Sequence, residues 1–324
     1  MSSRTPTGET RIFFCADIHG SERCFRKWLN AARSYRCDAL IFGGDLAGKI
    51  LQPIVEVGPG RYEAEMYGQR LVADSTSELQ AITDRIRNAG RYEVIVKPEE
   101  KRALDESPEL VHETFVRVAR ASATRWLELA DERLREVGIP AFMMLGNDDF
   151  IEMQDVFTGS ERVTNPEDRV VELPGGYEMI SLGYSNPTPW SSPRELSEVD
   201  LATRLGAMAS RLQDPGKSIF NFHVPPQGTH LDQAALLDET FTPIVSSGRV
   251  QMGNVGSTSV RSLIEHYQPI LSLHGHIHES PGMSKIGRTV AINPGSEYMD
   301  GILKGAIVTL DPRKGVKGWQ LVQG

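Results

Sequence analysis

The chain has 324 residues, of which 40% are hydrophobic and 24% are charged, and its formal net charge is −8. This balance is typical of a globular protein and excludes a largely disordered chain, while the length fits one large or two small domains. The negative charge argues against an extended nucleic-acid surface, because such surfaces neutralise phosphates with lysine and arginine.

Short apolar runs that recur along the chain predict the strands of an α/β fold. The first run, Arg11–Asp17, is followed by a predicted helix over Glu22–Arg33 and a second run over Asp38–Gly43. This order predicts a right-handed βαβ unit. Most runs end in glycine, asparagine, histidine or aspartate, which is typical of an α/β sandwich whose polar side chains project from strand ends. The later runs are Pro140–Leu145, Tyr177–Leu182, Lys217–Phe222, Pro269–Leu273 and Gly305–Leu310.

The segment between the second and third runs breaks this rhythm. Residues 51–73 are mixed and turn-rich, whereas Ser77–Ala89 and Pro108–Val137 have helical patterns. We therefore predict a mainly helical insertion that packs on the core and belongs to the same domain. The predicted divisions are a flexible tail, 1–9, a core, 10–50 and 138–324, and the insertion, 51–137.

Five short polar motifs each follow directly after an apolar run. Taken singly, each also fits a loop cap, a turn or a hydrogen-bonded core histidine. Taken together, they place metal-competent side chains at strand ends of one sheet, where α/β folds bind ligands. The motifs are Asp17-Ile18-His19, Gly43-Gly44-Asp45, Gly146-Asn147-Asp148-Asp149, Phe222-His223-Val224-Pro225-Pro226 and His274-Gly275-His276-Ile277-His278.

The side chains of these motifs form a set of nitrogen and oxygen ligands without a thiolate. Such a set suits divalent manganese, with iron or zinc as alternatives. Asp45 stands alone, and its two carboxylate oxygens can bridge two ions. We therefore predict two divalent ions roughly 3.5–4 Å apart, an arrangement that binds a phosphoryl oxygen and generates hydroxide at neutral pH. Seven of the oxygen- and nitrogen-bearing side chains in these motifs are competent to bind a metal ion.

The order and rough spacing of these motifs over residues 11–310, apart from the insertion, resemble the calcineurin-like metallophosphoesterase superfamily. The family pattern is D-x-H, G-D, G-N-x-D or G-N-H, H and then G-H-x-H. The resemblance implies a four-layer α/β/β/α sandwich. It also implies how the ligands divide: Asp17, His19, Asp45 and His278 for one ion, and Asp45, Asn147, His223 and His276 for the second.

Three further segments are similar to the Icc-related branch of predicted phosphoesterases: Gly183–Trp190, His223–Asp232 and Ser259–Pro269. Icc itself is known as a cyclic-nucleotide phosphodiesterase, whereas its relatives have scattered or unassigned substrates. Likeness at this level gives a poor basis for naming a substrate. The turn Asn293–Ser296 is one that the family places near its site.

The chain departs from many members of the family at Asp148, where they carry a histidine credited with stabilising the phosphoryl group and protonating the leaving oxygen. A carboxylate there repels an anionic substrate unless it is protonated or turned away, and it acts as a general acid only if its pKa is raised. The alternative is that Asp148 points to solvent or caps a turn. Because a diester carries one charge and a monoester two, Asp148 favours a phosphodiester substrate.

Three other residues are candidates for the site. His230, seven residues after His223, is a candidate to line the pocket or donate to phosphate, with an ordinary loop histidine as the alternative. Asn186 and Trp190 are candidates to contact a base or aryl group, with a proline-rich loop anchored by one aromatic side chain as the alternative. His274 is expected to orient a neighbouring ligand.

The sequence therefore predicts a dinuclear metallophosphoesterase that hydrolyses a phosphodiester of a small molecule. The alternatives are a phosphomonoesterase acting on nucleotides or phosphoproteins, and a non-catalytic scaffold, although a degenerate scaffold is expected to have lost ligands. A homo-oligomer that forms through the insertion is a further expectation.

The cellular setting is predicted from what the sequence lacks. Three cysteines without CxxC spacing (Cys15, Cys24 and Cys37) favour a reducing, cytoplasmic location. No run approaches the roughly 18–20 apolar residues of a membrane span, and Met1–Thr10 lacks the apolar part of a secretory signal. We therefore expect no membrane association.

Overall fold

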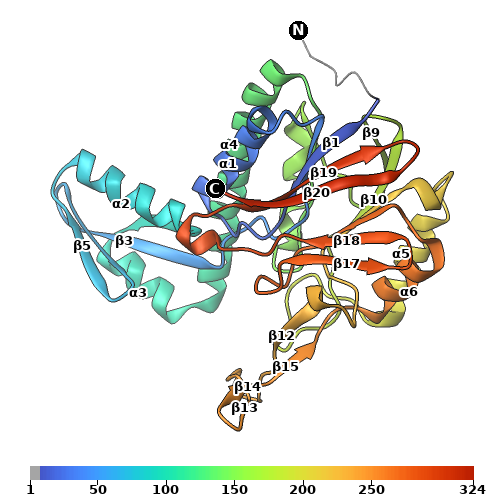
Figure 1. Cartoon of the computed structure of the whole chain (residues 1–324). Coiled ribbons are helices and arrows are strands. Elements are labelled where there is room, and N and C mark those ends of the chain that lie inside the picture. Colours follow the sequence, from blue (N-terminus) through green and yellow to red (C-terminus); the bar gives the residue numbers. More distant parts are fainter. Residues whose placement is uncertain (1–7) are drawn as a thin grey trace.

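Two six-stranded sheets form the centre of the computed structural model, which describes residues 8–324 (Figure 1). Residues 1–7 of the predicted tail lie outside the described part. The first sheet comprises β1 (Thr10–Cys15), β2 (Ala39–Phe42), β7 (Ala141–Met143), β8 (Val163–Thr164), β19 (Lys304–Asp311) and β20 (Gly315–Gln323), in the order β20-β19-β1-β2-β7-β8. The second comprises β9 (Val170–Leu173), β10 (Tyr177–Leu182), β11 (Ile219–Phe222), β16 (Leu271–Leu273), β17 (Gly282–Ile286) and β18 (Thr289–Asn293), in the order β17-β18-β16-β11-β10-β9.

Three hydrophobic cores separate four layers of structure. Because side chains alternate along a strand, Phe13 of β1 packs toward the helices while Ile12 and Phe14 pack toward the other sheet. Helices α1 (Glu22–Ser34) and α4 (Pro108–Val137) cover the first sheet, and α5 (Glu198–Ala209) and α6 (Thr258–Tyr267) cover the second. The predicted α/β/β/α sandwich is confirmed.

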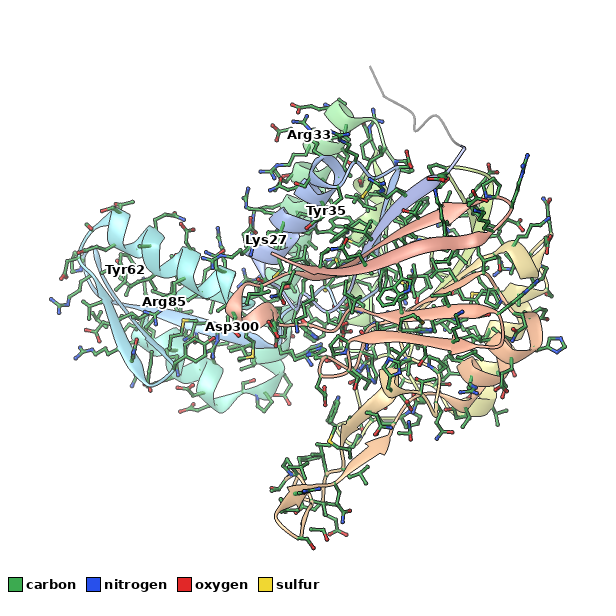
Figure 2. The ribbon with its side chains drawn as sticks, in the orientation of Figure 1. Lys27, Arg33, Tyr35, Tyr62, Arg85 and Asp300 are labelled. Carbon is green, nitrogen blue, oxygen red and sulfur yellow. The ribbon has the colours of Figure 1, made fainter. Side chains whose placement is uncertain are left out.

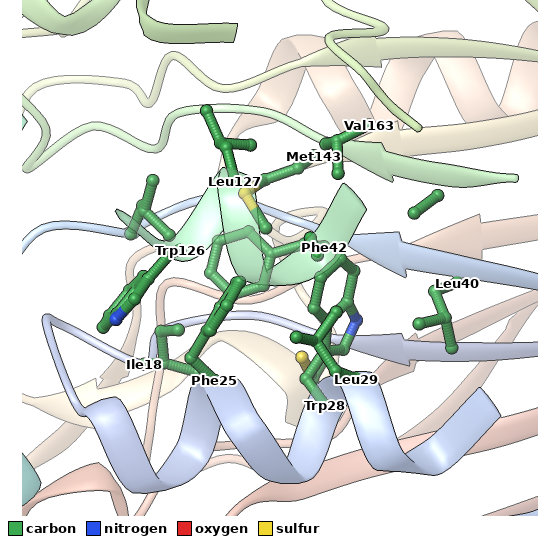
Figure 3. Packing of buried hydrophobic residues seen from close by; sticks show 14 of the residues in the cluster. Ile18, Phe25, Trp28, Leu29, Leu40, Phe42, Trp126, Leu127, Met143 and Val163 are labelled. Atoms are coloured by element: carbon green, nitrogen blue, oxygen red, sulfur yellow. The ribbon is translucent and has the colours of Figure 1, made fainter. Parts of the chain in front are cut away.

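The outer core of the first sheet joins α4 to α1 through aromatic side chains (Figure 3). Phe25 of α1 stacks on Trp126 of α4 with ring centroids 4.5 Å apart. Trp28 of α1 packs edge-on against Phe42 of β2 at 6.0 Å. The last helix of the insertion is therefore part of the sandwich and holds the insertion to the core.

The predicted strands and helices of the sandwich are confirmed. Each apolar run forms a strand, and β1 and β2 pair in parallel on either side of α1 in sequence. Helix α4 has the predicted bounds, and the Ser107 side chain accepts a hydrogen bond from the Leu110 N–H as its N-cap. Short 3₁₀ helices occur at η1 (Ile151–Met153), η2 (Val156–Gly159), η3 (Pro215–Lys217), η4 (His230–Asp232) and η5 (Tyr298–Asp300).

The insertion contains a sheet that the sequence analysis does not predict. Residues 51–73, interpreted as turn-rich, form most of β3 (Ile50–Gly58), β4 (Arg61–Met66) and β5 (Gln69–Ala73), and β6 (Arg91–Val96) completes the order β5-β4-β3-β6. Helix α2 (Thr76–Asn88) packs on one face and α3 (Pro98–Glu106) on the other. The sequence does not indicate these strands because most of their side chains are polar or exposed. Only a few are buried, such as Ala64 and Met66 in β4, so no continuous apolar run is present.

The sheet of the insertion and helices α2 and α3 form a lobe beside the sandwich (Figure 1). Figure 2 shows Tyr62 and Arg85 on this lobe and Asp300 where the lobe meets the sandwich. Arg85 and Asp300 line the same surface pocket. The Tyr92 hydroxyl of β6 accepts a hydrogen bond from the Gly48 N–H at 3.1 Å, so the lobe also supports the loop that follows β2.

A hairpin arm, residues 233–254, projects from one end of the second sheet (Figure 1). Strand β12 (Gln233–Ala235) pairs with β15 (Met252–Asn254), and β13 (Val245–Ser246) pairs with β14 (Arg249–Val250) near the tip. Several apolar side chains of the arm are exposed: Leu236, Phe241, Val245, Val250 and Met252.

Within residues 8–324, no helix combines the length and apolar character that crossing a membrane requires. The three cysteines are buried and have free thiols.

Candidate metal centre

The predicted ligands converge at the carboxyl ends of strands from both sheets. The prediction that they lie on one sheet is wrong. The strands are alike in sequence, so only their pairing shows that they belong to two different sheets. The two sheets pack face to face, and the site lies where strands of both sheets end. Asp17 and His19 follow β1, Asp45 follows β2 and Asn147 follows β7 in the first sheet, whereas His223 follows β11 and His276 and His278 follow β16 in the second.

One half of the site is formed by the D-x-H motif and the last histidine. His19 Nε2 lies 3.1 Å from His278 Nε2. His278 Nε2 also lies 3.4 Å from Asp17 Oδ1, and His19 Nε2 lies 3.6 Å from Asp45 Oδ2. These four side chains are the set that the family resemblance implies for one ion.

The other half is formed around His223. Its Nδ1 donates to the Gly43 carbonyl at 2.8 Å, so Nε2 is the ring nitrogen that would bind an ion once it has lost its proton. This Nε2 lies 3.4 Å from Asp45 Oδ2, and His276 Nδ1 lies 2.8 Å from Asn147 Oδ1. The structure thus brings all seven predicted ligands into one cluster.

Asp45 lies between the two halves of the site, and only one of its carboxylate oxygens faces both of them. Its Oδ2 faces both His19 and His223, whereas its Oδ1 accepts a hydrogen bond from the Asp148 N–H at 3.0 Å. Asp45 Oδ2 is therefore the oxygen directed at both halves of the site, whereas the backbone after Asn147 occupies Oδ1. That Asp45 bridges two ions stays a prediction.

The donor atoms fit divalent metal ions. His223 Nε2 is buried and has no hydrogen-bond partner. Ligand bonds of about 2.0–2.2 Å place the donors around one ion at most roughly 4.4 Å apart. The donor pairs satisfy this limit: His19 Nε2 and His278 Nε2 lie 3.1 Å apart, His278 Nε2 and Asp17 Oδ1 3.4 Å, and His223 Nε2 and Asp45 Oδ2 3.4 Å.

The backbone at the site is held in an unusual conformation. Asp17, His19, Asp45 and His276 all have positive φ angles, of 57°, 40°, 58° and 68°. Side-chain-bearing residues seldom adopt this left-handed region, and such strain concentrates at functional sites. The strand ends are thus folded to aim these side chains at a common point.

Two motif glycines are required by close approach to the ligands. A Cβ atom on Gly146 would lie 2.1 Å from Asp45 Oδ1, and one on Gly275 would lie 2.3 Å from Asp17 Oδ2. Both glycines therefore let the backbone pass directly against a ligand carboxylate.

The electrostatics of the cluster keep its carboxylates ionised. Burial raises the pKa of Asp45, but the nearby positive charge of protonated His223 outweighs it and holds this pKa well below the ordinary value. Burial lowers the pKa of His19 to about 3 and that of His276 to about 4, so both imidazoles are neutral at neutral pH, as metal ligands are. Burial opposes protonation of His223, but Asp45 and Asp17 raise its pKa to about 9.

Asp149 is a positioning residue to which sequence reasoning assigned no role. Its buried carboxylate accepts hydrogen bonds from the N–H groups of Leu46 at 3.0 Å, Ala47 at 2.6 Å and Gly146 at 2.7 Å. Burial, with a contribution from Asp45, raises its pKa to about 7 despite these bonds. It ties the loop after β2 to the loop after β7, and its place at the end of the G-N-x-D motif was the available signal.

Asp148 neither points to solvent nor caps a turn. Its carboxylate forms an ion pair with Lys49 and accepts hydrogen bonds from Ser192 Oγ at 2.6 Å and Asn147 Nδ2 at 2.9 Å, and its side chain is 14% exposed. Burial lowers the pKa of Lys49, but the negative charges of Asp45 and Asp148 raise it by more than burial lowers it. The pKa of Lys49 is therefore raised overall. Sequence reasoning missed Lys49, because a single lysine before an insertion carries no motif.

His230 does not reach the cluster. The Thr229 side chain caps η4, and the exposed His230 ring turns toward β17, where its Nδ1 lies 3.0 Å from Ser284 Oγ. The proposed catalytic role of His230 is therefore corrected to an outward contact.

His274, which was expected to orient a neighbouring ligand, is buried against the backbone on either side of His223. Its Nδ1 lies 2.8 Å from the Phe222 carbonyl and 3.1 Å from the Val224 carbonyl, the two neighbours of His223. On the other side of the site, Asn293 Nδ2 donates to the Ile277 carbonyl at 2.8 Å, and Ser296 Oγ donates to the Asp17 carbonyl at 2.6 Å. The predicted turn Asn293–Ser296 therefore lies at the site.

A pocket of about 400 Å³ opens over the cluster. Asn186 and Trp190, the predicted substrate contacts, line it together with Lys49 and Asp148. Asn186 Nδ2 is already engaged, because it donates to the Val255 carbonyl at 3.2 Å, whereas the Trp190 side chain is half exposed.

The chain is similar to a known protein over part of its sequence and to a solved structure in its fold. No family model matches the chain. An uncharacterized protein of Methanocaldococcus jannaschii is 32% identical over 130 residues, a match to 39% of this chain and 52% of that protein, so the match spans about half the length of this relative. One crystal structure shares the fold with a TM-score of 0.56 at 14% identity, covering 97% of this chain and 99% of its own. TT1561 of Thermus thermophilus gives a TM-score of 0.49 at 15% identity, covering 97% and 98%.

Proposed function

We propose that this chain is a calcineurin-like metallophosphoesterase that hydrolyses a phosphodiester at two divalent metal ions. The observation that carries the proposal is Asp45 Oδ2, which faces His19 in one half of the site and His223 in the other. A buried carboxylate shared between two histidine groups is what a two-ion site requires. The fold is common to many activities, so the proposal rests on these residues.

The residues of the site would have two roles, binding the metal ions and fixing the loops that carry the ligands. Two bound ions supply a hydroxide at neutral pH and positive charge for the phosphoryl oxygens. The four residues Asp17, His19, Asp45 and His278 would hold one ion, and Asp45, Asn147, His223 and His276 the other. Asp149 keeps the loops that carry Asp45 and Asn147 at a fixed separation. The nitrogen and oxygen donors favour manganese, with iron or zinc as alternatives.

Lys49 is the one lysine or arginine among the described residues that line the pocket, and it would donate to a non-bridging phosphate oxygen. Asp148 holds the Lys49 ammonium group over the site. Because this pair is close to neutral, repulsion by Asp148 no longer argues for a diester. The diester remains the proposal because Lys49, the one cation among the described lining residues, is already paired with Asp148, and a diester brings one negative charge to the site where a monoester brings two.

Removal and return of metal tests the proposed function. Protein stripped with a chelator is expected to lose hydrolysis of bis-p-nitrophenyl phosphate, because both the nucleophile and the phosphate charge depend on the ions. Addition of manganese is expected to restore the rate, followed by release of p-nitrophenolate. An unchanged rate in the stripped protein, with metal content verified, would contradict the proposal.

A phosphomonoesterase is the second candidate, because Lys49 offsets the charge of Asp148 and so tolerates a dianion. Rates on p-nitrophenyl phosphate and on bis-p-nitrophenyl phosphate share one leaving group and separate the two candidates. The diester is expected to be the better substrate. A higher kcat/KM for the monoester would reverse the choice.

The proposal also covers the location of the protein in the cell, its self-association and the size of its substrate. Three buried free thiols support a reducing, cytoplasmic location. Exposed apolar side chains on the insertion sheet, including Val57, Val72 and Ile95, support self-association through the lobe. We expect the substrate to be a small phosphate ester rather than an extended nucleic acid.

A further inference from the structure

The pocket over the metal cluster has two kinds of lining. Its floor is charged or polar and carries Asp45, Lys49, Asn147 and Asp148. Its two walls are apolar and come from segments far apart in the chain. One wall is the loop 186–190, and the other is the base of the hairpin arm, 234–237, with Val255 and Ile277.

The first wall presents an exposed tryptophan beside two prolines. Trp190 is 52% exposed, and Pro187 and Pro189 line the pocket with it. The loop is fixed at both ends, because Asn186 Nδ2 donates to the Val255 carbonyl and Ser192 Oγ donates to the Asp148 carboxylate. A large apolar side chain is thus held at the mouth of a charged site on a restrained loop.

The second wall is held by the pairing of the arm. The Leu236 N–H donates to the Gln251 carbonyl at 2.8 Å, and the Leu236 side chain packs so closely over Gly253 that a Cβ there would lie 2.6 Å from it. Ser280 Oγ donates to the Gln233 carbonyl at 2.5 Å and fixes the start of the arm. Leu236, which remains 36% exposed, therefore has a defined position across the pocket.

The side-chain polar groups of the walls are engaged or inaccessible. The Thr188 hydroxyl donates to the Glu195 carboxylate, and the amide nitrogen of Asn186 donates to the Val255 carbonyl. Asn186 Oδ1 has no hydrogen-bond partner, but it is buried away from the pocket surface. The walls therefore offer little hydrogen bonding to a sugar or another polar group. What they offer is apolar surface, whose burial is favourable.

We propose that the substrate carries a bulky apolar ester group, which the two walls bind while its phosphate lies at the metal cluster. This inference rests on the proposed function. The occupant is the substrate because both walls belong to the same pocket as the ligands, so whatever fills them also reaches the cluster. The walls thus select among phosphodiesters by their apolar group and not by their charge.

Binding of phosphonates to the metal-loaded protein tests the inference without hydrolysis. Calorimetry with methylphosphonate, phenylphosphonate and hexylphosphonate compares ligands with one anionic group and different apolar parts. The phenyl or hexyl compound is expected to bind at least roughly tenfold more tightly than the methyl compound. A planar group is indicated if phenyl is preferred and a flexible chain if hexyl is preferred.

Variants of the walls identify the residues responsible. Trp190→Ala and Leu236→Ser are expected to reduce the affinity ratio of phenylphosphonate or hexylphosphonate to methylphosphonate severalfold, whereas the control variant is expected to keep the wild-type ratio. Trp319→Ala is the matched control, because Trp319 is a 40% exposed tryptophan on β20 that lines a different pocket. Equal affinity for all three phosphonates, or no binding of any, would overturn the inference.

A parallel assay separates this inference from the proposed function. Methyl p-nitrophenyl phosphate and phenyl p-nitrophenyl phosphate share a leaving group, and the phenyl ester is expected to have the higher kcat/KM in wild type but not in Trp190→Ala. Preferential binding of the larger phosphonates with no hydrolysis of either ester would contradict the phosphodiesterase and support the apolar pocket. Equal hydrolysis of both esters with equal phosphonate affinities would contradict the pocket alone.

Discussion

Replacement of Asp45 by asparagine is expected to lower kcat on bis-p-nitrophenyl phosphate by at least roughly a thousandfold. Asp45 Oδ2 faces His19 and His223, and asparagine removes the negative charge that would hold two cations there. Metal ions contribute several kcal/mol to stabilising a phosphoryl transition state, and a thousandfold corresponds to about 4 kcal/mol.

The fold of the Asp45→Asn variant is expected to survive. The substitution keeps the side-chain shape but removes the buried partner that raises the pKa of His223, so urea unfolding of the metal-free protein is expected to show a cooperative transition at reduced stability. Asp200→Asn is a suitable control, because Asp200 is an exposed carboxylate on α5. Substantial activity in a verified Asp45→Asn preparation would contradict the shared-ligand account.

Replacement of Lys49 by methionine is expected to lower kcat/KM by roughly 10- to 100-fold. The variant loses the cation of the pocket and leaves the Asp148 carboxylate without its ionic partner. A charge-assisted hydrogen bond to phosphate is worth roughly 1.5–3 kcal/mol, which sets this range. The measurement is the full kinetic comparison of variant and wild type, with Lys217→Met on the protein surface as the control.

A double-mutant cycle shows whether Lys49 and Asp148 act as a pair. Asp148→Asn in the Lys49→Met background is expected to recover part of the loss, because it removes the carboxylate that the first substitution left unpaired. Strictly additive effects of the two substitutions would indicate that the ion pair has no functional coupling. Wild-type kinetics in Lys49→Met would remove Lys49 from the site.

The metal ligands could be predicted from the sequence because their chemistry is local. Asp17 and His19 lie two residues apart after one strand, and His276 and His278 repeat that spacing after another. A short apolar run indicates where the strand ends, and the motif then indicates which side chains project there. The sequence did not indicate which sheet each strand would join, because that depends on pairing between distant segments.

The residues that were missed or misplaced depend on contacts distant in sequence. Lys49 gains its role only because Asp148 folds against it from the far side of the insertion. His230 was placed by its spacing from His223, but the turn capped by Thr229 directs its ring toward Ser284. Spacing along a loop does not specify direction in space, so neither outcome was available from the pattern of residues.

The insertion sheet shows the same limit for secondary structure. Its strands bury few residues, such as Ile54 and Ala73, and their remaining side chains are polar or partly exposed. Apolar periodicity identifies a strand that is buried on one face throughout, and it fails for strands stabilised by a small local core. Helix α4, with a long apolar stripe and a serine cap, was predicted with its correct bounds.

The number of metal ions per chain tests the central claim most directly. Metal-free protein saturated with manganese, freed of excess ion and analysed by elemental mass spectrometry, is expected to retain two ions per chain. The Asp45→Asn variant is expected to retain fewer, because its shared carboxylate is lost. Retention of one ion or none by the wild-type chain at saturation would contradict the dinuclear site.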